Sequence, residues 1–355
     1  IEMAATLNEA IGKTHKVVLF KAYCPEGLPQ LGENFEVVER QVEAPKAGEV
    51  LFEVMALSVD PYMRARMKNI KSYAPGFSLG ESPQGAGVLR VVQAGEGADE
   101  RFASGKLFAG FTSWSEYVLM GKDALAGLSA LPTDETTLSP LNFLSGLGMP
   151  SMTAYFGLLR VCAPKEGETV LVTGAAGAVG SMVGQIARLH GCRVIGTAGT
   201  DEKCDFLRTE CGFDVAINYK TTEDMSAAIA AAAPNGIDCF FDNVGGPIAD
   251  AVWTHLNLFA RVAQCGAIAG YNAATPSMRP DRDWIVITKR IKLQGILVTD
   301  WQEEKGEFLG AMSKWIAAGK IRIRETHRHG LENIIDAFND MMNGENIGKM
   351  IVVVK

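Results

Sequence analysis

The spacing of apolar residues changes along the chain, and this change predicts two kinds of domain. Up to residue 137 the apolar residues form short β-type runs that Gly and Pro interrupt, which is typical of a compact β-barrel. From residue 138 onward, short apolar runs alternate with stretches whose apolar positions recur at helical spacing, as in a doubly wound parallel sheet. The sequence therefore predicts an α/β protein with domains at 1–137 and 138–318, and a tail, 319–355, that returns to the first domain.

The individual runs give the expected elements. Strands of the first domain are expected at 17–20, 35–38, 50–57, 87–92 and 114–120. Strands of the second domain are expected at 169–173, 192–197, 215–217, 237–241, 258–265 and near 291–297. The tail shows β character at 321–324 and 350–354, and helical patterns cover 304–318 and 331–342.

One strand–turn–helix segment carries the clearest chemical signal. An apolar run from residue 169 leads into three glycines spaced three apart, Gly174, Gly177 and Gly180, and an amphipathic helical pattern follows. This is the layout of a dinucleotide-binding unit: the glycines permit the turn, the approach of backbone to a pyrophosphate, and close packing of helix on strand. The turn also contains Ala176, Ala178 and Val179, and we expect all six residues to contact the coenzyme.

The next strand indicates which dinucleotide is bound. An NAD site usually carries an acidic residue about 20 positions after the first glycine, where it binds the ribose hydroxyls. Here the strand ends in Gly196–Thr197–Ala198–Gly199 without a carboxylate, and Lys203 and Tyr219 follow nearby. A lysine and a phenol suit a 2′-phosphate, so the sequence favours NADP over NAD. The alternative is that Lys203 is a solvated helix residue and Tyr219 a surface aromatic.

Charge and composition narrow the expected partners. The formal net charge of −7 argues against nucleic acid or an acidic membrane surface, since both attract basic proteins. No apolar stretch approaches the ~20 residues that span a bilayer, and the N-terminus lacks a signal-peptide core. Seven cysteines without a CxxC pair are typical of reduced thiols, so we expect a cytoplasmic protein. Ile1 is not expected to be the native start.

Several motifs along the chain resemble those of a known family. They are NFE at 34–36, SVDPYMR at 58–64, GMP at 148–150, TAYFGL at 153–158, AAGAVG at 175–180, NYK at 218–220, FDNVGG at 241–246 and NIGK at 346–349. In this order they resemble the zinc-independent medium-chain dehydrogenases/reductases. The chain is most similar to the NADPH-dependent alkenal double-bond reductases, which include leukotriene/prostaglandin reductases, plant double-bond reductases and bacterial curcumin reductase.

The resemblance implies a GroES-like barrel that the C-terminal strands complete, a Rossmann domain, and a cleft between them. It also implies that Lys203 and Tyr219 bind the 2′-phosphate. Further positions match residues that line the NADP(H) coenzyme in the family: Asn243, Cys265, Gly266, Ala267, Ile268, Tyr271, Ile296, Leu297, Val298 and Asn346. Relatives lead us to expect a homodimer.

The implied reaction adds hydride to the β-carbon of an α,β-unsaturated aldehyde or ketone, and negative charge develops on the carbonyl oxygen. Tyr271 matches the active-site tyrosine of the family, and a phenol can donate a hydrogen bond to that oxygen. Tyr62, from the first domain, is a second candidate. Each could instead be a packing aromatic.

Three alternatives stay open at this point. A zinc enzyme shares the architecture, but residues 80–85 hold no histidine ligand, and 58–61 hold no cysteine. His327 and His329 could face one side of a strand, without a third ligand. A quinone reductase would use the same fold and coenzyme. A non-catalytic regulator would have the same fold and bind NADP(H) without turnover.

Overall fold

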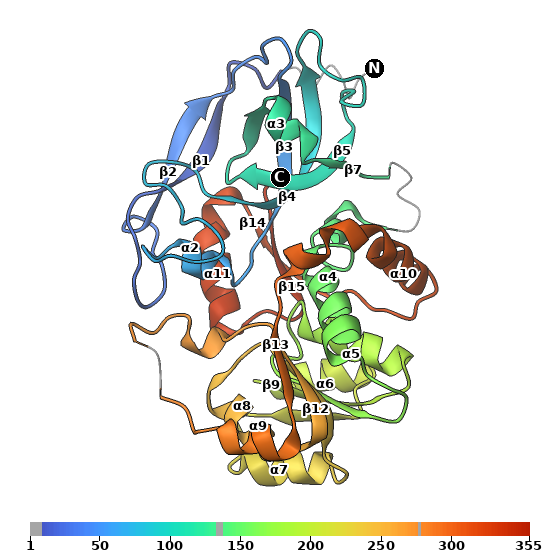
Figure 1. Cartoon of the computed structure of the whole chain (residues 1–355). Coiled ribbons are helices and arrows are strands. Elements are labelled where there is room, and N and C mark those ends of the chain that lie inside the picture. The colour runs from blue at the N-terminus through green and yellow to red at the C-terminus, as the bar shows by residue number, and fades with distance from the viewer. Residues whose placement is uncertain (1–8, 133–137, 276–277) are drawn as a thin grey trace. The chain divides into compact units, whose positions relative to one another are not determined.

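The computed structural model describes residues 9–132, 138–275 and 278–355, which form two compact units (Figure 1). The first unit takes in the chain up to Leu144, together with Thr326–Glu345 and Met350–Lys355. The second unit consists of Ser145–Glu325 and Asn346–Lys349. The expected boundary after residue 137, the position of Ile1 and the rest of the extreme N-terminus lie outside the described residues. The expected boundary at 318/319 lies N-terminal to the division after Glu325.

The first unit is built on β-sheets. A seven-stranded sheet runs in the order β14-β15-β3-β4-β5-β7, with β6 paired to β3, and β1 and β2 form a separate antiparallel pair. Its strands are β1 (Thr14–Phe20), β2 (Phe35–Gln41), β3 (Val50–Ser58), β4 (Gln84–Ala94), β5 (Leu107–Ser113), β6 (Tyr117–Met120), β7 (Ser129–Ala130), β14 (Glu325–His329) and β15 (Lys349–Val353). Its helices are α2 (Met63–Arg66), α3 (Lys122–Ala126), α11 (Ile334–Asn343) and the 3₁₀ turns η1 (Pro140–Phe143) and η5 (Leu331–Asn333).

The C-terminal strands join the sheet of the first unit, as the tail pattern predicts. Strand β15 pairs antiparallel with β3, with Ile351 opposite Ser58 and Val353 opposite Ala56. Figure 1 shows these late strands, coloured red, in the sheet that also holds β3 and β4. Strand β3 is buried almost throughout, because sheet partners and α11 enclose it in one apolar cluster. The segment that follows β3, with Asp60 and Tyr62, is therefore attached to the best-buried strand of the unit.

Two of the strand predictions are wrong in detail, and two strands are missing from them. Residues 321–324 do not form a strand, and β14 begins only at Glu325. The run predicted at 114–120 is a strand only from Tyr117, because Trp114 is a fully buried core side chain before it. The sequence does not predict β5 or β7. Glycine and polar residues break the alternation in β5, and β7 is only two residues long.

The second unit contains one six-stranded parallel sheet in the order β10-β9-β8-β11-β12-β13. This is the doubly wound order, in which the chain reverses direction across the sheet between β8 and β11. The strands are β8 (Thr169–Val172), β9 (Arg193–Ala198), β10 (Val215–Asn218), β11 (Ile237–Asp242), β12 (Leu256–Gln264) and β13 (Lys292–Gly295). All six strands predicted from the sequence are present. Ligands of such sheets bind at the carboxyl ends of the strands, at the reversal point.

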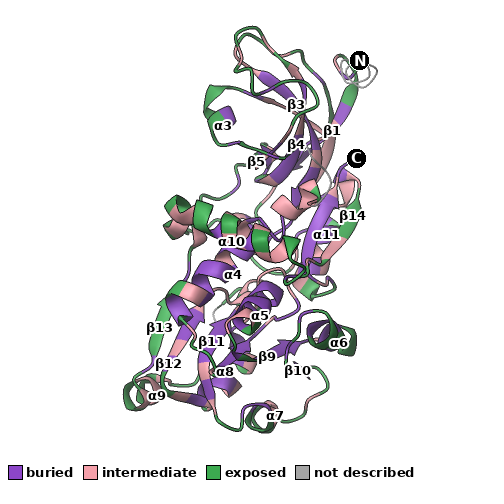
Figure 2. Cartoon of the chain, turned by 90° about the vertical axis from the view of Figure 1, so that its right-hand side faces the viewer, coloured by how far each residue is buried: buried purple, intermediate pink, exposed green. Residues whose placement is uncertain are grey.

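Helices cover both faces of this sheet and bury its central strands, which Figure 2 shows in the colour of buried residues. Helix α5 contributes Val183, Ile186 and Ala187, all without exposed surface, as its apolar spacing predicts. The helices are α4 (Met149–Phe156), α5 (Gly180–Leu189), α6 (Asp201–Thr209), α7 (Met225–Ala232), α8 (Gly246–Trp253), α9 (Asp283–Lys289), α10 (Lys305–Ala317), the π-helix η2 (Gly157–Cys162) and the 3₁₀ turns η3 (Ile268–Gly270) and η4 (Val298–Glu304).

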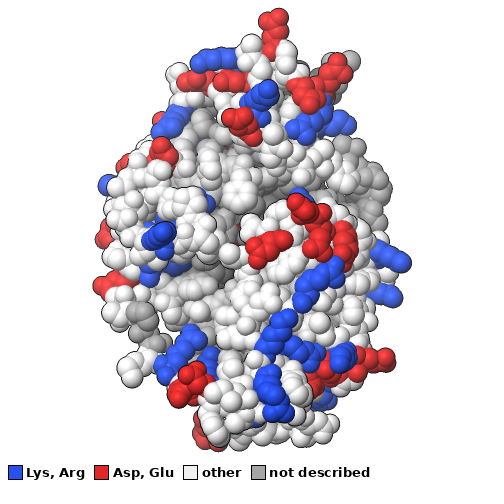
Figure 3. Space-filling view, viewed as in Figure 1, with Lys and Arg blue, Asp and Glu red and all other residues white. Residues whose placement is uncertain are grey.

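Among the described residues, no helix combines the length and apolar character that crossing a membrane requires. On the face shown in Figure 3, acidic and basic side chains form small interspersed groups.

Candidate functional site

The glycine turn after β8 has a backbone that side chains cannot adopt without strain. Gly174 has a φ of +59°, and a Cβ at this position would lie 3.2 Å from the Val244 side chain. A Cβ at Gly180 would lie 2.4 Å from the carbonyl oxygen of Gly174, so only glycine lets α5 approach the strand this closely. Within the described residues, the backbone N–H groups of Ala178 and Val179 donate no hydrogen bond inside the protein. These N–H groups, before the first turn of α5, are suited to bind an anion such as a phosphate.

The C-terminal loop before β15 lies against this turn. The N–H of Gly348 donates to the carbonyl of Ala176 at 2.8 Å, and Gly348 and Gly177 form an isolated β-bridge. Asn346 is buried, and its side-chain amide donates to the carbonyl of Gly348 at 2.7 Å. Asn346, expected to line the coenzyme, thus also shapes the loop beside the glycine turn. The sequence does not predict the contact of Gly348 with the glycine turn, although the NIGK motif contains this residue.

The ends of β9 and β10 form the region where a 2′-phosphate is expected. A Cβ at Gly199 would lie 2.7 Å from the hydroxyl of Tyr219, so this phenol packs directly on the glycine backbone. Lys203 lies in the first turn of α6 and is only 9% exposed, in contrast to a solvated helix residue. The Thr200 side chain caps this helix by accepting from the Lys203 N–H. The carboxylate of Asp201 accepts a hydrogen bond from the Asn218 side chain, which ties the start of α6 to the end of β10. Lys203 and Tyr219 thus follow the neighbouring strands β9 and β10.

Residues at the ends of β8 and β11 form a buried polar network. The Asp242 carboxylate has no exposed surface and accepts from the Thr173 hydroxyl at 2.7 Å and from the Val244 and Gly245 N–H groups. Asn243 donates from its side chain to the Thr173 carbonyl at 2.8 Å. Because both strands end at the reversal point, this network fixes the floor of the expected coenzyme site. Asp242 and Thr173 were not singled out from the sequence.

Tyr271 lies in the loop after β12, at the same edge of the sheet. Its hydroxyl accepts a hydrogen bond from the Ala267 N–H at 3.1 Å, which closes the short loop through Gly266, Ala267 and Ile268. Burial raises the pKa of Tyr271 above its usual value of 10, an effect that the Ala267 N–H partly offsets. The phenol therefore stays protonated at neutral pH, and its O–H can donate to a ligand because the oxygen serves Ala267 as acceptor.

The remaining residues that are expected to line the coenzyme differ in how far they are buried. Burial raises the pKa of Cys265 to about 12, so its side chain is an unreactive thiol. Ile296 is buried and packs toward Gly157, where a Cβ would lie 2.6 Å from its methyl end. Leu297 is exposed, and Val298 begins η4. The loop 296–298 starts at the carboxyl end of β13. Of its three residues, Ile296 is the one packed in the core.

Tyr62 belongs to the first unit, where it precedes helix α2. Its hydroxyl is buried and has no hydrogen-bond partner among the described residues. Burial, followed by the negative charge of Asp60, raises the pKa of Tyr62, so the phenol holds its proton firmly. An unpaired buried hydroxyl costs about 1–3 kcal/mol, and a ligand that accepts its hydrogen bond would offset this cost.

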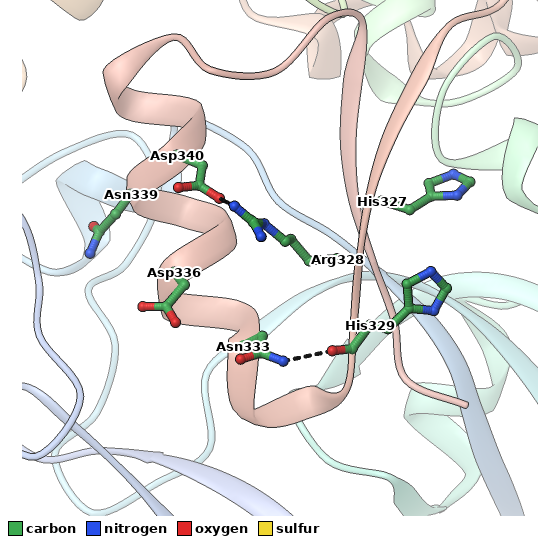
Figure 4. Close-up of a pocket in the computed structure, with 7 residues that line it drawn as sticks. All are labelled: His327, Arg328, His329, Asn333, Asp336, Asn339 and Asp340. Atoms are coloured by element: carbon green, nitrogen blue, oxygen red, sulfur yellow. Dashed lines mark hydrogen bonds and ion pairs between the residues drawn. The ribbon is translucent and has the colours of Figure 1, made fainter.

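The histidines considered as zinc ligands lie on a surface strand. Figure 4 shows His327 and His329 projecting from one side of β14, away from α11, while Arg328 between them turns toward Asp340 on that helix. These residues border a surface pocket of about 490 Å³. In the part of the chain that the structure describes, no three His, Cys, Asp or Glu side chains are grouped to hold a metal ion.

The second unit thus provides the features that a phosphorylated dinucleotide requires. A glycine turn with free N–H groups, a buried lysine after β9, a phenol packed on Gly199, and a tyrosine loop all lie after carboxyl ends of strands in one sheet. The residues present therefore fit NADP(H).

Comparison with known proteins agrees with these features. Residues 16–128 match the family model described as the N-terminal domain of oxidoreductase, and residues 178–314 match that of a zinc-binding dehydrogenase. Prostaglandin reductase 1 of Mus musculus is 42% identical over 92% of this chain and 95% of its own. The NADP⁺-dependent 2-alkenal reductase of Nicotiana tabacum is 39% identical over 96% of this chain and 98% of its own.

A solved structure shows the same architecture. CurA of Vibrio vulnificus in complex with NADPH superposes with a TM-score of 0.88 at 40% identity, covering 96% of this chain and 99% of its own. The predicted α/β fold class is confirmed. The chain belongs to the NADPH-dependent medium-chain dehydrogenase/reductase family.

Proposed function

We propose that this protein reduces the carbon–carbon double bond of α,β-unsaturated aldehydes and ketones with NADPH and without a metal. It is an NADP-dependent oxidoreductase acting on C=C bonds, like the alkenal and prostaglandin reductases that share about two fifths of its residues. The observation that carries the proposal is the location of Tyr271 and the glycine turn at the carboxyl edge of one sheet.

Bound NADPH supplies a hydride to the β-carbon of the substrate. The chain's own residues hold the coenzyme: the turn 174–180 binds the diphosphate, and Lys203 with Tyr219 binds the 2′-phosphate. The floor formed by Asn243, the loop 265–271, the segment 296–298 and Asn346 completes the site.

The hydroxyl of Tyr271 donates a hydrogen bond to the carbonyl oxygen, where negative charge develops. A neutral phenol in a site that excludes water stabilises this charge without a metal ion. Tyr62 is the second donor we propose, because its buried hydroxyl has no partner among the described residues.

An NADPH oxidation assay over a panel of acceptors tests the proposal. We expect oxidation with enals and enones, with NADH as a poor substitute. Oxidation with quinones alone would support the quinone reductase, and coenzyme binding without any oxidation would support a regulatory protein.

Replacement of Lys203 should change coenzyme preference. In Lys203→Met the KM for NADPH should rise about 10- to 100-fold, because a charge-assisted contact to the 2′-phosphate is worth about 1.5–3 kcal/mol. The KM for NADH should stay the same. Arg208→Met, on the same helix but paired with Asp205, serves as the control. An equal loss with both coenzymes would show that Lys203 supports only the fold.

We also propose a homodimer formed through β13. Among the described residues this strand pairs only with β12, on one side, and its four residues are exposed. Figure 2 shows the strand in the colour of exposed residues. Its own Leu293 is an exposed apolar residue, and neighbouring elements add Leu258, Phe259, Trp284 and Ile287. An unpaired edge with apolar side chains favours pairing with a second copy about a two-fold axis. The seven unpaired cysteines support a cytoplasmic location.

Leu293→Lys should therefore convert the dimer to a monomer, because a charged side chain on an edge strand opposes pairing. Sedimentation or light scattering measures the change. Leu79→Lys is the matched control, since Leu79 and Leu293 are both 52% exposed and Leu79 lies in the other unit. Dimers in both variants would place the interface elsewhere.

A further inference from the structure

The side-chain amide of Gln264, at the carboxyl end of β12, donates two hydrogen bonds. Its Nε2 donates to the Asp242 carboxylate at 3.0 Å and to the carbonyl of Gly266 at 2.6 Å. A carboxylate and a carbonyl only accept hydrogen bonds, so the nitrogen of the amide faces both of them. Asp242 is itself fixed, because its other oxygen accepts from the Thr173 hydroxyl and from two backbone N–H groups. Gln264 therefore connects a rigid carboxylate to the loop that carries Tyr271.

One peptide unit links Gln264 to the hydroxyl of Tyr271. The carbonyl of Gly266 and the N–H of Ala267 belong to the same planar group, and in a trans peptide they point in opposite directions. Gln264 binds the carbonyl, and the N–H donates to the Tyr271 oxygen at 3.1 Å. A rotation of this plane would move both groups together. The Gln264 hydrogen bond thus sets the direction of the N–H that the phenol accepts.

The start of this loop has backbone attachments of its own. The N–H groups of Cys265 and Gly266 donate to the carbonyl of Asp242 at 2.9 and 3.1 Å. These hydrogen bonds do not involve the Gln264 side chain. Loss of its amide should therefore release the orientation of one peptide unit while the loop stays attached to the end of β11.

The Ala267 N–H affects what the phenol of Tyr271 can donate. Because the oxygen accepts this N–H, the O–H of the phenol is left for a ligand. Hydrogen bonds that follow one another in this way polarise each other, so a phenol that accepts one bond donates the next more strongly. The same N–H lowers the pKa of Tyr271 against the larger effect of burial, which agrees with a more strongly polarised O–H.

We propose that Gln264 is a positioning residue, which holds the peptide between Gly266 and Ala267 so that Tyr271 directs a polarised O–H at the carbonyl oxygen of the substrate. The inference rests on the proposed function, in which Tyr271 is the donor to that oxygen. All of the groups involved belong to the second unit. Gln264 acts through Tyr271 and needs no contact with the substrate.

A double-mutant cycle on kcat tests this role. Gln264→Met keeps the length of the side chain but removes its donor, and we expect kcat to fall about tenfold because the donor to the developing charge is weakened. The affinity for NADPH should stay within about threefold, which separates an effect on the reaction from an effect on the coenzyme site. In the Tyr271→Phe background the same replacement should lower kcat by less than about twofold, because the hydroxyl on which Gln264 acts is absent.

Asn257 provides a matched control on the same strand. Its side-chain amide, near the opposite end of β12, donates to the carbonyl of Asn235 at 3.0 Å and to the Asp238 carboxylate at 2.8 Å. Asn257→Leu thus removes the same pair of contacts, one to a carbonyl and one to a carboxylate, away from Tyr271. Thermal unfolding of both single variants measures the cost to the fold, and kcat of Asn257→Leu should equal that of the parent.

Three results would overturn the inference alone. An unchanged kcat in Gln264→Met would show that the peptide keeps its orientation without the amide. The same loss in the Tyr271→Phe background as in the parent would show that Gln264 does not act through the phenol. A fall in NADPH affinity as large as the fall in kcat would make Gln264 a support of the coenzyme site. A parent protein that binds NADPH but reduces no conjugated carbonyl would overturn the proposed function and this inference together.

Discussion

Gly180→Ala should destabilise the second unit and nearly abolish NADPH binding. The new Cβ would lie 2.4 Å from the Gly174 carbonyl oxygen and 2.7 Å from the Ala175 Cα. Both atoms belong to the backbone, so α5 and the turn must move apart. Overpacking of this kind costs about 1–3 kcal/mol of the free energy of unfolding. Because the displaced N–H groups are the ones that we propose to bind the diphosphate, affinity for NADPH should fall at least about 100-fold, or ~2.7 kcal/mol.

Denaturant unfolding and calorimetric titration with NADPH measure the two effects. Gly310→Ala is the control, because no atom lies within 4 Å of a Cβ at this position of α10. That variant should bind NADPH normally and gain about 0.5–1 kcal/mol from helix propensity. Normal binding in Gly180→Ala would show that the turn does not hold the coenzyme.

Tyr271→Phe should lower kcat about 10²- to 10³-fold while the affinity for NADPH stays within about twofold. The phenol is the proposed donor to the carbonyl oxygen as charge develops there, and phenylalanine has no donor. The variant also leaves the Ala267 N–H without its acceptor, which costs about 0.5–1.5 kcal/mol of stability. Since its raised pKa keeps Tyr271 protonated, kcat should show no dependence on its ionisation between pH 6 and 9.

Single-turnover reduction of an enone measures the chemical step directly. Tyr155→Phe is the control: Tyr155 is buried in the same unit, and its hydroxyl donates to Glu307 at 2.9 Å. Loss of that hydrogen bond should lower stability without slowing reduction. If both variants reduce the enone as fast as the parent does, Tyr271 has no part in the reaction.

The parallel sheet could be predicted from the sequence because its strands are buried and apolar. The run Thr169–Val172 is buried throughout, so its composition reflects its position at the centre of the sheet. Strand β14 is different: its residues, Glu325–His329, are polar and half to fully exposed. The alternating apolar residues at 321–324 suggest a strand, but pairing with β15 places the strand one segment later.

The site could be predicted in part, where backbone geometry dictates residue type. The glycines of the turn are required by φ and by close approach, and both leave a pattern in the sequence. The burial of Lys203 and the lack of a partner for the Tyr62 hydroxyl depend on contacts made after folding. The Asp242 carboxylate accepts a hydrogen bond from the Thr173 hydroxyl. This contact likewise depends on folding, because the reversal in the sheet places the ends of β8 and β11 side by side.

The bridge between Gly177 and Gly348 has a consequence for how the protein matures. The loop that supports the diphosphate turn is made from residues 346–349, and the strand after it completes the other unit's sheet. Both units therefore stay incomplete until residues 346–353 have been synthesised. A change in this short stretch would disturb contacts of both units at once.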